Sequence, residues 1–189
     1  MKYRNLFLTF AFCLSVIPLL VSCGTGVDSP NSSGENNGNT APAFTFTPNN
    51  DVPGAGSIVM EKNTALSTSD VLAIDIKAHQ VGLVFGAAFD VEFDPAVIQF
   101  DGEVPGPLFN CDKSSVCRVK LITGNPAKLV IAASLVGSNT TQGDGTIVTL
   151  KFKAIGNGNS ALNFKGNSLL DSDLKPVKTN WSGGSLKKI

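Results

Sequence analysis

Histidine, tryptophan and tyrosine are almost missing from this sequence, since each occurs only once. The one histidine, His79, comes at the end of an apparent strand, and no Ser or Cys motif for nucleophilic catalysis accompanies it. An excess of positive charge is also lacking, because 15 basic residues stand against 15 acidic residues. The sequence therefore predicts no enzyme, no cofactor and no nucleic-acid partner.

The N-terminus carries an export pattern. Two basic residues precede an apolar run at 6–21, which has the length of a signal-peptide core and is short for a membrane span. The run ends in Leu20-Val21-Ser22-Cys23, which resembles the lipobox of bacterial lipoproteins. The resemblance implies a signal peptide at 1–22 and a lipid on Cys23. Because Gly24 rather than Asp follows, it favours an outer-membrane or cell-surface location in the cell envelope.

Residues 23–54 are rich in Gly, Asn, Ser, Pro and Thr, a composition that cannot bury enough apolar surface to fold. They predict a flexible linker that reaches on the order of 30 Å, followed by one domain at 55–189. Phe44 and Phe46 either dock locally or begin an edge strand, and the sequence does not decide between these alternatives.

Two cysteines fall inside the predicted domain. Cys111 and Cys117 are close in sequence, and export to an oxidising compartment favours a disulfide between them over two free thiols. A metal site is disfavoured because too few ligands remain to complete it: the chain has a single histidine, and the predicted domain has no third cysteine.

From residue 56 onward the apolar residues alternate with period two. The clearest examples are 72–78, 85–93 and 147–154, and turn signals such as Asp94-Pro95 and Gly143-Asp144-Gly145 separate these runs. No segment has a helical stripe with caps. Eight to ten half-buried antiparallel strands at this spacing predict an all-β sandwich of two sheets.

Three segments resemble the cohesin domain family. Residues 89–98 form an apolar strand that ends in Phe-Asp-Pro and an aliphatic pair, in which Asp94 can accept backbone N–H bonds of the turn. Residues 143–154 form a Gly-rich turn and a long alternating strand, and 169–186 resemble the closing strands. The resemblance implies a nine-stranded antiparallel jelly-roll β-sandwich, related in shape to carbohydrate-binding modules.

The resemblance also implies a function. Cohesins bind dockerin modules, which carry calcium loops, and assemble polysaccharide-degrading enzymes through one flat sheet face. In this sequence the expected partner-binding face consists of Ala88, Asp90, Glu92, Lys120, Ala132 and Ser134, with Val84 and Gly86 on the same strand side. The alternative is a sheet face that meets only solvent. The Cys111–Cys117 loop and the single domain depart from the cohesin pattern.

The sequence gives weaker support for other functions. Five carboxylates lie at 90–103, but neighbouring outward positions of a strand form a surface and not the cleft of a glycoside hydrolase. Asp171 and Asp173 lack the rest of a calcium loop and predict a polar turn. Trp181 is the one residue suited to direct carbohydrate binding, which is the alternative function. A structural envelope lipoprotein is the third hypothesis.

Overall fold

A computed structural model describes residues 44–111 and 115–189 of the 189-residue chain. These residues form strands and turns, with no helix among them. The strands are β1 (Phe44–Pro48), β2 (Ser57–Asn63), β3 (Val71–Val84), β4 (Gly86–Phe93), β5 (Ile98–Pro105), β6 (Ser115–Ile122), β7 (Ala127–Leu135), β8 (Thr141–Ala154), β9 (Asn159–Leu170), β10 (Pro176–Val177), β11 (Asn180–Ser182) and β12 (Gly184–Lys188).

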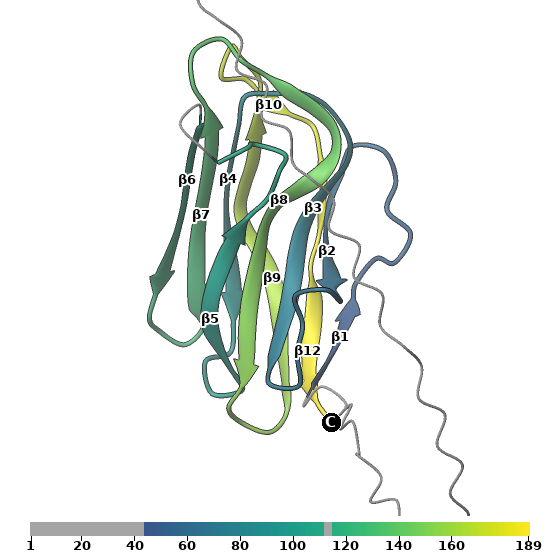
Figure 1. Ribbon diagram of the computed structural model, residues 1–189, viewed down its shortest axis with the longest axis vertical. Helices are drawn as coiled ribbons and strands as arrows, with labels where there is room; N and C mark the ends of the chain where they lie inside the picture. The colour runs from purple at the N-terminus through teal and green to yellow at the C-terminus, as the bar shows by residue number, and fades with distance from the viewer. Residues whose placement is uncertain (1–43, 112–114) are drawn as a thin grey trace, which may run out of the picture. The chain divides into compact units, whose positions relative to one another are not determined.

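The strands form two sheets that pack face to face as a sandwich (Figure 1). The first sheet has the order β1-β12-β9-β4-β7-β6, with β10 added to β9, and the second has the order β11-β2-β3-β8-β5. The predicted all-β sandwich is therefore confirmed. The described residues form twelve strands where nine were expected, because β1, in the expected linker, and the short segments β10 and β11 also pair. β11 runs parallel to β2, whereas every other pair is antiparallel in the described part of the chain.

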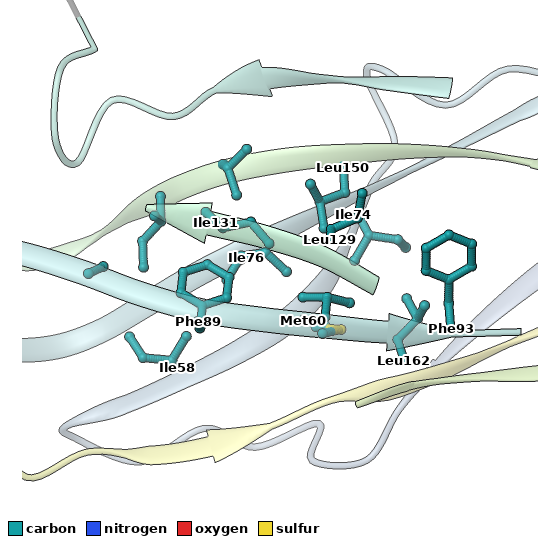
Figure 2. Close-up of a cluster of buried hydrophobic side chains, with 14 of the residues drawn as sticks. Ile58, Met60, Ile74, Ile76, Phe89, Phe93, Leu129, Ile131, Leu150 and Leu162 are labelled. Atoms are coloured by element: carbon teal, nitrogen blue, oxygen red, sulfur yellow. The ribbon is translucent and has the colours of Figure 1, made fainter. Parts of the chain in front are cut away.

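The core lies between the sheets and consists of the inward half of each alternating strand. Ile74, Ile76 and Leu150 from one sheet face Phe89 and Leu129 from the other, as Figure 2 shows. All of these side chains are almost completely buried. Full burial of one such side chain stabilises the fold by about 1.5–3 kcal/mol, so the alternation alone fixes which face of each strand points inward.

The strand β1 lies in the range that the sequence assigns to the linker. It pairs with β12, and Phe44 is buried, so the edge-strand alternative for Phe44 and Phe46 is the one observed. Gly184 of β12 leaves room for the Phe46 ring of β1, because a Cβ atom at position 184 would collide with that ring. No helix within the described residues is long and apolar enough to cross a membrane.

Two local predictions are confirmed. A disulfide joins Cys111 to Cys117 with a Cα–Cα distance of 5.6 Å, within the usual range for this bond. Asp94 ends β4 as expected, because its Oδ1 accepts a hydrogen bond from the backbone N–H of Ala96 at 2.9 Å. The turn then delivers the chain from the first sheet to β5 in the second.

Candidate functional site

The solvent-facing side of β9, β4, β7 and β6 is a continuous surface, which we call the outer face. Within β4 and β7 the exposed or half-exposed residues alternate with buried ones, so their side chains point away from the core. The outer face consists of Ala88, Asp90 and Glu92 from β4, Lys128, Val130, Ala132 and Ser134 from β7, Val116, Arg118, Lys120 and Ile122 from β6, and Asn163, Lys165 and Ser168 from β9.

Strand register places these residues in rows across the sheet. Ala132 of β7 is paired with Ala88 on one side and with Arg118 on the other. In the next row Val130 stands between Asp90 and Lys120. The centre of the outer face therefore carries only small or β-branched side chains. Such a centre is flat enough for a helix to lie across it.

The charges of the outer face are separated across the strands. Arg118 and Lys120 lie on the edge strand β6, whereas Asp90 and Glu92 lie on β4. Lys128 Nζ is 2.8 Å from Asp90 Oδ2. This hydrogen bond, the charge of Asp90 and the more distant charge of Glu92 together raise the pKa of Lys128, so Lys128 stays protonated and partly neutralises Asp90.

Two other cations of the outer face remain unpaired. Among the described residues, the side chains of Lys120 and Lys165 make no hydrogen bond and no ion pair. Val116 and Val130 are also exposed, by 50% and 36%. Unpaired charge beside exposed apolar side chains is the composition of a protein-binding surface with a small apolar centre.

The structure brings all six predicted face residues to this one surface. Val84 was expected there too, but it ends β3 in the second sheet and is buried. Gly86 lies opposite Ser134 on the expected side of β4, but it is also buried. Sequence reasoning missed Arg118 and Val130. Val130 lies in the continuous apolar run at 129–133, which gives no sign of an outward-facing residue. Strict alternation from Leu129 and Ile131 nevertheless assigns Val130 to the outside.

Trp181 does not form an exposed platform. Its ring is half-buried and lies 5.2 Å from the Phe89 ring and 5.0 Å from the Phe164 ring, measured between centroids. Its Nε1–H donates a hydrogen bond to Thr179 Oγ1 at 2.8 Å. This aromatic cluster closes one side of the sandwich, and Phe164 and Trp181 line an open hollow there.

His79 lies within β3 and not after the end of a strand, which corrects the sequence-based placement. Its Nε2 is 2.8 Å from Glu61 Oε1, and Lys77 Nζ is 3.0 Å from Glu61 Oε2. Burial raises the pKa of Glu61, but the hydrogen bonds and charges of Lys77 and His79 outweigh it, and the net pKa is lowered. The charged groups of this cluster therefore pair with one another, and the cluster lies on the second sheet, away from the outer face.

The remaining carboxylates do not form a catalytic pair. Asp101 lies on β5, in the second sheet, where it forms an ion pair with Lys153, so it does not share a face with Asp90. Asp171 Oδ1 accepts the backbone N–H groups of Asp173 and Lys175, which are the hydrogen bonds of a polar turn. No group of three metal-binding side chains is found within 44–111 and 115–189.

The two-sheet topology and the flat outer face define a β-sandwich of the binding-module type. The family model of the cohesin domain matches residues 56–185, and the chain belongs to the cohesin family. This family consists of non-catalytic protein-binding modules. No curated protein matches the chain.

Solved cohesins share the fold. A type II cohesin domain from the cellulosome of Acetivibrio cellulolyticus is 16% identical with a TM-score of 0.55, and the match covers 69% of this chain and 95% of that one. A cohesin module from a Clostridium perfringens family 33 glycoside hydrolase is 13% identical with a TM-score of 0.55, covering 72% and 98%. A type I cohesin–dockerin complex from Clostridium thermocellum is 16% identical with a TM-score of 0.52, covering 63% and 85%.

Proposed function

We propose that this chain is a non-enzymatic module that holds a dockerin-type protein through its outer face. The observation that carries the proposal is the match to the cohesin family over residues 56–185. The cohesin–dockerin complex among the structural neighbours supports this type of partner. The outer face supports the location, because it combines a flat centre of small residues with unpaired charge.

The charge arrangement indicates how a partner would lie. A helix across Ala88, Val130 and Ala132 would place one flank over the cations of β6 and the other over the carboxylates of β4. Complementary charges on such a helix set its orientation and its rate of association more than its affinity. In this proposal calcium acts in the partner, whose calcium-binding loops require it to fold.

The proposal includes an envelope location. A lipid on Cys23 would tether the chain to a membrane, and the segment between Cys23 and β1 would let the domain reach a partner; residues 23–43 lie outside the described residues. Replacing Cys23 with Ala should abolish labelling by a radioactive fatty acid and move the chain from the membrane fraction to the soluble fraction. Retained labelling would refute Cys23 as the lipidated residue.

We extend the proposal to polysaccharide breakdown, because two structural neighbours are described with a cellulosome and with a glycoside hydrolase. The dockerin-type partner would then be an enzyme or scaffold of that process. Identifying the partner tests this step directly.

Affinity capture with the full chain tests the proposal. Envelope and secreted proteins of the source organism are applied with calcium and again with a chelator, and the bound proteins are identified by mass spectrometry. A partner with calcium loops that binds only with calcium is expected. Capture of no calcium-dependent partner would refute the dockerin-type assignment.

Variants then test the outer face with the purified partner. Ala132→Glu places a charged, longer side chain at the flat centre and should weaken binding by a factor of 30 or more, since burying an unpaired charge at an interface costs about 2–5 kcal/mol. Asp90→Lys should weaken binding as well. Ala96→Glu, an exposed alanine in the turn after β4, is the matched control. Equal binding by Ala132→Glu and Ala96→Glu would remove the outer face from the proposal.

A further inference from the structure

The hollow beside Trp181 arises from the path of the C-terminal strands. Along β9, the pairing with β12 stops at Leu162, and the pairing with β10 involves only Leu169 and Leu170. Between these points the chain crosses to the second sheet, where β11 pairs with β2. One edge of β9 from 163 to 168 is therefore left without a strand partner in the described structure, and β11 forms the opposite wall of the hollow.

The walls of the hollow are rich in amide groups. Four asparagines from three segments of the chain converge on it: Asn49, Asn163, Asn167 and Asn180. Their side chains make no hydrogen bond with any other described residue. The backbone nevertheless fixes two of them, because the Asn49 N–H donates to Gly183 O at 2.9 Å and the Asn180 N–H donates to Gly56 O at 3.0 Å. The hollow thus presents side-chain amides that have no hydrogen-bond partner among the described residues, on a backbone that hydrogen bonds hold in place.

The side chains that line the hollow indicate which class of ligand would fit it. Each amide offers donors and an acceptor, which match hydroxyl groups that both donate and accept. Lys165 is the only charged side chain among the described residues that line the hollow. Phe164 and Trp181 add apolar ring surface, which suits the C–H faces of a sugar. The hollow has a volume of about 550 Å³, within the range of about 300–1,000 Å³ for small-molecule sites.

A peptide strand added to the free edge of β9 would be a different occupant. The register between β4 and β9 shifts between Ala88 and Asp90, and Gly166 of β9 has a φ of 54°. This irregularity breaks the regular spacing of backbone groups that a new strand would need. The observations therefore favour recognition by side chains.

We propose that the hollow lined by Asn49, Asn163, Asn167 and Asn180 beside Trp181 binds a neutral oligosaccharide. The ligand is a soluble chain or chain end that enters the hollow, and not a flat polysaccharide surface, because Trp181 is half-buried. This site is separate from the proposed dockerin-binding function, although Asn163 and Lys165 border both surfaces.

Trp181 is the only tryptophan of the chain, so its fluorescence reports on this hollow alone. The full chain, in a detergent without a sugar headgroup, is titrated with cello-, xylo- and mannohexaose and with acidic oligogalacturonate. A saturable change in emission with a neutral hexasaccharide is expected. No saturable change with any neutral member, or a change with the acidic member alone, would overturn the proposal.

Substitutions locate the binding. Asn163→Ala and Asn167→Ala each remove a side-chain amide that has no hydrogen bond to another described residue, and each should weaken binding at least roughly threefold. Asn157→Ala, in the exposed turn between β8 and β9, is the matched control and should leave affinity unchanged. Ala132→Glu should weaken partner binding by a factor of roughly 30 or more while saccharide binding persists, so the two proposals can fail separately. Wild-type affinity in both asparagine variants would overturn the site.

Discussion

Replacing Phe89 with Leu tests whether the aromatic cluster holds the side of the sandwich together. The Phe89 ring is 2% exposed and lies 5.6 Å from the Phe164 ring and 5.2 Å from the Trp181 ring. Leucine keeps most of the apolar burial but removes both ring pairs, which contribute about 0.5–1.5 kcal/mol each. The unfilled ring volume adds about 1 kcal/mol. We expect the free energy of unfolding to fall by about 2–4 kcal/mol in total.

The assay is urea denaturation followed by circular dichroism, with Trp181 emission as a second readout. Phe100→Leu is the matched control, because Phe100 is half-buried and forms one pair, with Phe152 at 6.1 Å, away from Trp181. The control should cost about 1 kcal/mol and leave the emission of the folded chain unchanged. If Phe89→Leu costs no more than Phe100→Leu and leaves the emission unshifted, the aromatic cluster does not have the assigned role.

Two further predictions concern the other sheet and the disulfide. The pKa of Glu61 lies below its ordinary 4.5, so the ionised side chain stabilises the fold above about pH 4.5 and this stabilisation is lost as the pH falls through the lowered pKa. Glu61→Gln should therefore flatten the acid side of stability measured by urea denaturation, and parallel profiles would contradict the assignment. The double variant Cys111→Ser, Cys117→Ser should lose about 2 kcal/mol, from the entropy of closing a loop with a sequence separation of 6. Reduced wild-type protein should match it, and equal stability of oxidised protein and variant would argue against this effect.

Local sequence features predicted much of the fold. The alternation around Phe89 and Val91 specified the inward side of β4, and Asp94-Pro95 specified its end, because period and turn chemistry are properties of neighbouring residues. The disulfide was also predictable, since Cys111 and Cys117 are close along the chain. These features require no knowledge of which strands pair.

Features that depend on strand pairing could not be predicted. Asp90 and Lys120 share a row only because β7 lies between β4 and β6. The hollow beside Trp181 requires β11 to leave the first sheet and run parallel to β2, and nothing in a three-residue strand encodes that step. His79 was misplaced for a related reason, since β3 continues to Val84 through register shifts that interrupt its pattern.

The outer surfaces of the two sheets differ in how their polar groups are satisfied. On β2, β3 and β8 several polar side chains pair with one another: Glu61 contacts Lys77 and His79, and Asp75 accepts hydrogen bonds from Asn63 and Thr149. Among the described residues of β2, β3 and β8, Leu83 near the end of β3 is the one exposed large apolar side chain.

The outer face of β9, β4, β7 and β6 has the opposite character. Among the described residues, Lys120 and Lys165 lack partners, and Val116, Ile122 and Val130 are exposed. A surface whose charges are already paired gains little from a protein partner, because binding must first desolvate groups that have no new interaction to form. A surface with unpaired cations around an apolar centre gains both charge pairing and apolar burial. This contrast supports the proposal that a partner binds the outer face and not the opposite sheet.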